Sequence, residues 1–205
     1  MFIGTLELFK CGIGPSSSHT MGPMYAAAEF LQLSEHYLAQ STNEQTLYLS
    51  CILKGSLAYT GKGHGTDKAI ALGVNGYTPA DLANKDVDTL LASIWQKNSI
   101  ILAGVELAFK AEKHIVFDYG KALSEHPNGM IFQLCNQNNE VLLSDTYFSI
   151  GGGFICTAEN IHSSLESEEQ QRACPYPFKS AKAMMQMSSD SGLSIAQMKK
   201  TNELQ

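Results

Sequence analysis

The chain has 205 residues, of which 44% are hydrophobic and 17% charged, so it is long enough to bury a substantial core. Its formal net charge is -6 with only 14 lysines and arginines, which removes the electrostatic basis for nucleic-acid binding. No apolar run approaches the ~20 residues of a membrane-spanning helix, and the N-terminus shows no basic region followed by an apolar one. We therefore expect a cytoplasmic protein that binds neither membranes nor nucleic acids.

The first predicted helix is preceded by a run of hydroxyl side chains. Apolar residues recur at helical spacing over residues 24–38, and the run lies where that helix should begin. It consists of Ser16, Ser17, Ser18, His19 and Thr20. A helix start offers unpaired N–H groups and a partial positive charge, which together favour a small anion such as a carboxylate. A plain N-cap is the simpler alternative, but a cap needs only one hydroxyl, so we favour a ligand site.

Strands and helices then follow in a mixed order. Alternating apolar residues predict a strand from Leu47 to Leu53 that leads into Gly55. Helical segments are expected at residues 68–72 and 81–96. Further strands are expected at residues 99–102, 115–117, 130–135 and 141–150, the last two joined by a hairpin at 136–139. This order predicts an α+β fold, with helices packed on a mixed sheet, rather than a regular βαβ repeat.

A glycine-rich segment at residues 60–67, which we expect to form a loop, carries a candidate catalytic base. His64 lies between Gly63 and Gly65, so the backbone there can approach a ligand closely. Histidine accepts a proton near neutral pH because its ordinary pKa is about 6.5. An incidental surface histidine is the alternative. Phosphate binding is a rival use of such a loop, but a Walker motif requires Ser or Thr after Gly-Lys, where this chain has Gly63.

Two further turns and the spacing of potential metal ligands complete the inventory of candidate sites. The turn at residues 125–130 could supply the Asn128 amide, although Pro-Asn-Gly is first of all a turn-forming sequence. The three glycines at residues 151–153 lack the helix-opening context of a dinucleotide site, and we interpret them as structural. The five cysteines are widely spaced, and the six histidines form no zinc-helix pair. We therefore expect no metal site built from this chain alone.

The C-terminal part of the chain is expected to be separate from the first domain, which we predict over residues 1–157. Residues 158–174 are polar and acidic, which is typical of a linker. Short helical segments follow at residues 181–187 and from Ser194. Residues 175–205 have too little mass for a core of their own, so they either pack on the first domain or open another.

Four sequence blocks, in this order, resemble the iron–sulfur-dependent bacterial L-serine dehydratases. The blocks are residues 9–24, residues 61–66, residues 126–130 and residues 147–154. The resemblance covers nearly the whole chain. It implies that residues 1–157 are the family's β domain and that residues 175–205, with their Pro-Tyr-Pro-Phe and Gly-Leu-Ser-Ile stretches, are the truncated start of its α domain.

The resemblance implies an enzyme that converts L-serine to pyruvate and ammonia with a 4Fe-4S cluster and without pyridoxal phosphate. In the family, the three cluster cysteines lie in the α domain, and none of the five cysteines here stands at a matching position. The expected partners are therefore L-serine, the α domain and, in a homodimer, a second copy. We expect this chain alone to bind no cluster and to turn nothing over.

The resemblance and the two polar segments together predict the roles of the site residues. His64 would be the base that removes the α-proton of serine. The substrate contacts would come from Ser16, Ser17, Ser18, His19, Thr20, Lys62, Gly63 and Asn128. Two other functions stay open: an amino-acid-binding regulatory module without catalytic residues, and a scaffold without a ligand. The catalytic hypothesis requires that His64 and the hydroxyl run converge on one pocket.

Overall fold

The structure is a computed structural model that describes residues 10–41, 46–161, 174–178 and 180–204. It divides into two compact units. The larger unit runs from Cys11 to Ile161, and the smaller one includes the C-terminal residues 174–204. The expected linker lies largely in residues 162–173, outside the described residues, and the assignment of the smaller unit to an α domain stays a prediction.

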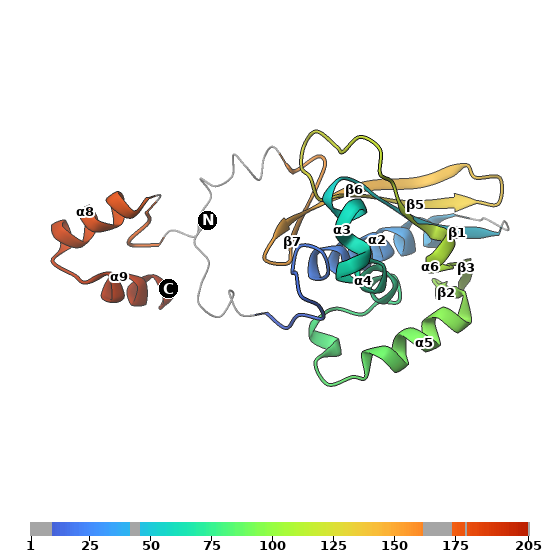
Figure 1. The fold of residues 1–205 in the computed structure, drawn as a ribbon, viewed down its shortest axis with the longest axis horizontal. Coiled ribbons are helices and arrows are strands. Elements are labelled where there is room, and N and C mark those ends of the chain that lie inside the picture. The colour runs from blue at the N-terminus through green and yellow to red at the C-terminus, as the bar shows by residue number, and fades with distance from the viewer. Residues whose placement is uncertain (1–9, 42–45, 162–173, 179, 205) are drawn as a thin grey trace. The chain divides into compact units, whose positions relative to one another are not determined.

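A mixed sheet forms the centre of the larger unit (Figure 1). The seven described strands are β1 (Leu47–Leu53), β2 (Ser99–Leu102), β3 (Val105–Ala108), β4 (Ile115–Phe117), β5 (Gly129–Asn136), β6 (Val141–Gly151) and β7 (Phe154–Thr157). Their order is β2-β3-β1-β5-β6-β7, with β4 also paired to β1. β1 runs parallel to β3 and β4 and antiparallel to β5, which confirms the predicted α+β fold with a mixed sheet.

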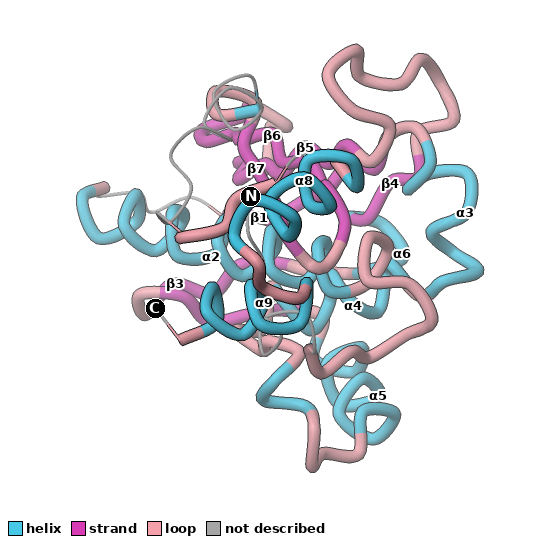
Figure 2. Tube along the Cα trace, turned by 90° about the vertical axis from the view of Figure 1, so that its left-hand side faces the viewer, coloured by secondary structure: helices cyan, strands magenta, loops and turns pink. Residues whose placement is uncertain are grey.

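Helices α2, α4 and α5 lie on the same side of the β5–β6 hairpin in both views (Figures 1 and 2). The described helices of the larger unit are α2 (Met21–Gln40), α3 (Ser56–His64), α4 (Thr66–Gly73), the 3-10 turn η1 (Ala80–Leu82), α5 (Val87–Lys97) and α6 (Ala111–His114). No helix in the described ranges combines the length and the apolar character that crossing a membrane requires.

The core is built from the inward residues of the sheet and one face of α2. The rings of Phe30 in α2 and Phe132 in β5 stack at 5.6 Å, and Tyr147 in β6 packs edge-on against Phe132 at 5.9 Å. Two glycines allow closer contacts. A Cβ on Gly73 would lie 2.4 Å from the Met24 carbonyl oxygen, and one on Gly22 would lie 2.1 Å from Ser149 Oγ. The start of α2 is therefore held against the end of β6.

The glycine-rich segment at residues 60–67 is not a loop, so that prediction is wrong. α3 continues to His64, Gly65 takes a left-handed conformation with φ of 78°, and α4 begins at Thr66. The corner between the two helices is tight: a Cβ on Gly61 would lie 2.9 Å from Thr66 Oγ1. The small residues that suggested a loop are required by this helix–helix corner instead.

Some of the other helix and strand boundaries agree with the predictions, and others differ from them. β1, β2 and β4 coincide with the predicted strands, and β5 and β6 form the predicted hairpin. The helix predicted over residues 81–96 is replaced by η1 and by α5, because Asp86 caps α5 by accepting a hydrogen bond from the Thr89 N–H. β3, β7 and α6 were not predicted. Gly152 and Gly153 form the turn between β6 and β7, and both have positive φ, as does Gly151 at the end of β6.

The smaller unit contains two described helices, α8 (Ala181–Ser191) and α9 (Ile195–Glu203). The Ser180 hydroxyl caps α8, and Ser194 and Gln197 form a capping box at the start of α9. The buried Asn202 side chain bonds both the N–H and the carbonyl of Tyr176, each at 2.9 Å. These contacts tie the segment before α8 to the end of α9.

Candidate functional site

The predicted hydroxyl run forms a compact turn that leads directly into α2. The N–H groups of His19 and Thr20 donate to the Ser16 carbonyl, and that of Gly22 donates to the Ser17 carbonyl, at 3.0 to 3.1 Å. The Thr20 hydroxyl also donates to the Ser16 carbonyl, at 2.8 Å, and does not cap the helix. Because these N–H groups are already bonded, the binding capacity of the turn lies chiefly in its side chains.

His19 joins this turn to α3. Its ring is buried, and Nδ1 lies 2.9 Å from Ser18 Oγ and 3.4 Å from Ser16 Oγ. On the other edge of the ring, Nε2 lies 2.9 Å from Thr60 Oγ1 and 3.2 Å from Ser56 Oγ. Ser56 and Thr60 could not be recognised from the sequence as site residues, because single hydroxyl residues on a helix are common and only the fold brings these two to His19.

His64, the candidate base, lies beside His19. Their ring centroids are 4.6 Å apart, with 36° between the ring planes. His64 Nδ1 lies 2.8 Å from the Thr60 carbonyl oxygen, which can only accept, so Nδ1 carries the proton in the neutral ring. No described residue bonds Nε2. The half-buried His64 ring thus presents an unshared electron pair, the form that a general base needs.

The burial of His19 affects its charge. Burial lowers the pKa of His19 below the ordinary 6.5, and the charge of His64 lowers it further. A hydrogen bond to the backbone carbonyl of Ser56 partly opposes this shift. Since the net shift is downward, His19 is neutral at neutral pH and can both donate and accept a hydrogen bond among the surrounding hydroxyls.

The α3–α4 corner holds the remaining residues of the second polar segment. The buried Thr66 hydroxyl donates to the His19 carbonyl at 2.6 Å, which fixes the serine turn to the start of α4. Lys62 forms an ion pair with Asp67, and 74% of the Lys62 side chain is exposed. A Cβ on Gly63 would meet nothing within 4 Å, so this backbone is open to approach.

Asn128 supports the site from outside the histidine pair. Its side-chain amide donates to the Ser149 carbonyl at 3.1 Å, and its backbone N–H donates to His126 Nδ1 at 3.1 Å. The neighbouring Pro127 carbonyl accepts a hydrogen bond from the Ser56 N–H at 2.8 Å. The structure therefore joins this turn to the start of α3, and substrate contact by Asn128 stays a prediction.

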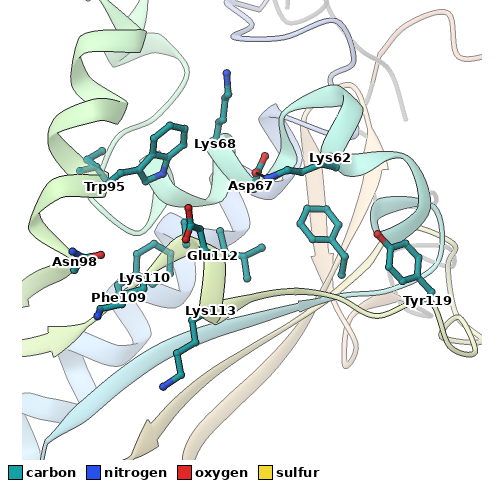
Figure 3. Close-up of a pocket in the computed structure, with 14 residues that line it drawn as sticks. Lys62, Asp67, Lys68, Trp95, Asn98, Phe109, Lys110, Glu112, Lys113 and Tyr119 are labelled. Atoms are coloured by element: carbon teal, nitrogen blue, oxygen red, sulfur yellow. Dashed lines mark hydrogen bonds and ion pairs between the residues drawn. The ribbon is translucent and has the colours of Figure 1, made fainter.

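A cleft of about 690 Å³ borders the α3–α4 corner (Figure 3). Lys62 and Asp67 lie at its edge, and Trp95 and Phe117 line it. Neither His19 nor His64 is among its lining residues. Lys68 and Lys113 extend from it in opposite directions, so their ammonium groups do not converge on one anion.

The described residues do not fit an iron–sulfur cluster. Among them, no group of three or more His, Cys, Asp or Glu side chains is arranged to hold a metal ion. All five cysteines are free thiols, with Cys51, Cys135 and Cys156 buried in the larger unit. A cluster ligated by cysteines would therefore need ligands from beyond these residues.

Comparison with known proteins assigns the family. Residues 4–160 match the family described as "Serine dehydratase beta chain". The L-serine dehydratase of Helicobacter pylori is 36% identical over 199 residues, which cover 97% of this chain and 42% of that protein. L-serine dehydratase 1 and L-serine dehydratase TdcG of Escherichia coli K12 are each 37% identical, over 98% of this chain and 43% of theirs. This chain thus spans less than half the length of these relatives. It belongs to the serine dehydratase beta chain family.

Proposed function

We propose that this chain supplies the β half of the active site of an L-serine dehydratase, which converts L-serine to pyruvate and ammonia. The observation that supports this most directly is the 4.6 Å distance between the ring centroids of His64 and His19. His19 belongs to the serine turn and is bonded to Ser18, so this distance places the turn beside His64. Two segments far apart in the sequence thus contribute a base and a set of hydroxyls to one place. Such a pairing of a proton acceptor with polar positioning groups suits proton abstraction next to a carboxylate.

In this proposal, His64 Nε2 removes the α-proton of L-serine. Ser16, Ser17, Ser18 and Thr20 with His19 hold the substrate carboxylate, and Lys62 and Gly63 border it. Loss of the α-proton and of the β-hydroxyl, as water, leaves an enamine. The enamine tautomerises to an imine, and water hydrolyses the imine to pyruvate and ammonia, so one water is released and one is consumed.

Departure of the hydroxyl needs assistance, because hydroxide is a poor leaving group. We propose that this assistance comes from outside the chain, from a 4Fe-4S cluster held by the α domain, and that pyridoxal phosphate takes no part. The proposal also places the complete enzyme in the cytoplasm as a homodimer and predicts no turnover by this chain alone.

A chimera tests the proposal. In the chimera, this chain replaces the matching part of the Helicobacter pylori L-serine dehydratase. The remainder of that protein then completes the enzyme. The chimera is expected to release pyruvate from L-serine, and the isolated chain is expected to release none. A chimera that retains the relative's fold and metal content but does not turn over L-serine would count against the proposed function.

A further inference from the structure

Thr60 lies between the two imidazoles and contacts each with a different atom. Its backbone carbonyl oxygen lies 2.8 Å from His64 Nδ1, and its hydroxyl oxygen lies 2.9 Å from His19 Nε2. Thr60 lies in the middle of α3, so one residue of that helix sets the surroundings of both rings. These contacts decide which nitrogen carries the proton in the His19 ring and in the His64 ring.

The hydroxyl of Thr60 has a single proton, and its place can be deduced. Thr60 Oγ1 also lies 2.9 Å from the Ser56 carbonyl oxygen, which can only accept, so the hydroxyl donates there. Thr60 Oγ1 is then left as an acceptor toward His19 Nε2. Ser56 Oγ, 3.2 Å from the same nitrogen, can accept from an N–H there as well. The Thr60 contact therefore favours a proton on His19 Nε2.

The opposite edge of the His19 ring completes the proton count. With the proton on Nε2, Nδ1 keeps its unshared pair and accepts from the Ser18 hydroxyl at 2.9 Å. Ser18 Oγ can in turn accept from the Ser16 hydroxyl at 3.1 Å. The result is one directed series of hydrogen bonds from Ser16 through Ser18, His19 and Thr60 to the carbonyl of Ser56.

We propose that Thr60 is a positioning residue that holds the two histidines in opposite tautomers, His19 with its proton on Nε2 and His64 with its proton on Nδ1. His64 thereby presents Nε2 as a base, while in the substrate-free chain the Ser18 hydroxyl donates to His19 Nδ1 and turns to the carboxylate when L-serine binds. The consequence for catalysis rests on the proposed function, whereas the tautomers themselves do not.

Nitrogen NMR of the imidazole rings distinguishes the two tautomers, and it would be measured on the 205-residue chain with isotope-labelled histidine. We expect His19 as the Nε2–H form and His64 as the Nδ1–H form. Thr60→Val removes the hydroxyl at an exposed position and keeps the backbone carbonyl, so His19 should lose its preference for Nε2–H while His64 keeps its form. Thr60→Ser should restore the preference of His19.

A matched control separates the hydroxyl from a general effect on the fold. Thr201 makes the same kind of bond to the carbonyl four residues earlier, at Gln197, in the other unit. Thr201→Val should leave both tautomers unchanged. An Nδ1–H form of His19 in the parent chain, or a His19 tautomer that Thr60→Val does not alter, would overturn the proposal. The parent and Thr60→Ser measurements decide the matter even where Thr60→Val does not fold.

Turnover in the chimera tests the catalytic consequence separately. Thr60→Val should lower kcat about tenfold, roughly the value of one neutral hydrogen bond, and Thr60→Ser should recover most of it. An altered tautomer with unchanged turnover would support the assignment of the tautomers and overturn the catalytic role. An inactive parent chimera, in contrast, would bear on the proposed function and leave the NMR result standing.

Discussion

His64→Ala in the chimera is expected to lower kcat for L-serine by about 10²- to 10⁴-fold, the range that a positioned general base contributes. The loss should appear in kcat more than in KM, because removing the base affects proton transfer and leaves the polar turn at residues 16–20 in place. The steady-state rate of pyruvate formation measures this. His64 is suited to the role because the Thr60 carbonyl holds the proton on Nδ1, which leaves Nε2 free to accept.

His36→Ala is the matched control for this experiment. His36 is an exposed residue of α2 that is bonded to Gln40, and its replacement should leave kcat unchanged. A regulatory role for the polar turn makes a different prediction, since an amino-acid sensor would show altered cooperativity with turnover largely kept. If His64→Ala behaves in that way, His64 is not the base.

Gly55→Ala is expected to lower the free energy of unfolding by about 2 to 5 kcal/mol, from backbone strain and steric overlap together. Gly55 connects β1 to α3 with φ of 56° and ψ of -128°, a conformation that residues with a Cβ rarely adopt. A Cβ there would also lie 2.3 Å from the Pro127 carbonyl oxygen, which bonds the Ser56 N–H. The substitution therefore strains the connection between β1 and α3, the helix that carries Ser56, Thr60 and His64.

Gly63→Ala provides the contrast, measured by urea denaturation in parallel. Gly63 is helical and its Cβ would meet nothing within 4 Å, so alanine should leave stability unchanged or raise it by up to about 1 kcal/mol. A Gly55→Ala chain as stable as the parent would show that the β1–α3 connection tolerates a side chain. That result would contradict the close approach of Pro127 seen in the structure.

Strands were predictable where burial alternates along the chain. In β1, Leu47, Leu49, Cys51 and Leu53 are buried while the residues between them are half-buried, so the pattern marks the strand directly. β3 has only four residues, and it follows a turn with Ala103 at φ of 50°, a conformation that no sequence rule assigns to alanine. Its pairing with β1 comes from the fold rather than from local preference.

Helices were harder to predict where packing outweighs local preference. Glycines normally weaken a helix, so Gly61, Gly63 and Gly65 predicted a loop. In the structure, Gly61 is buried against Thr66, and only Gly65 needs a left-handed backbone. Tertiary contact thus makes the C-terminal turn of α3 helical, and this turn gives His64 a fixed hydrogen bond that a loop would not supply.

The residues proposed to act on the substrate were predictable from the sequence, but the residues that hold them in position were not. The runs that contain Ser18, His19 and His64 carried recognisable patterns, and the fold brings them together. Ser56 and Thr60 could not be identified, because their importance depends on α3 lying beside the serine turn. Asn128 was identified from the sequence, but its contacts in the structure are to Ser149 and His126 rather than to the histidine pair.

The pKa of His19, followed by NMR with and without His64, tests the convergence of the two segments most directly. In the parent chain this pKa should lie below 6.5, because the ring is buried and the positive charge of protonated His64 opposes a second charge. His64→Gln removes that charge and should raise the pKa of His19. The pKa of His114, which burial and two nearby lysines lower independently, should stay unchanged. A His19 pKa that does not respond to His64→Gln would contradict the shared site.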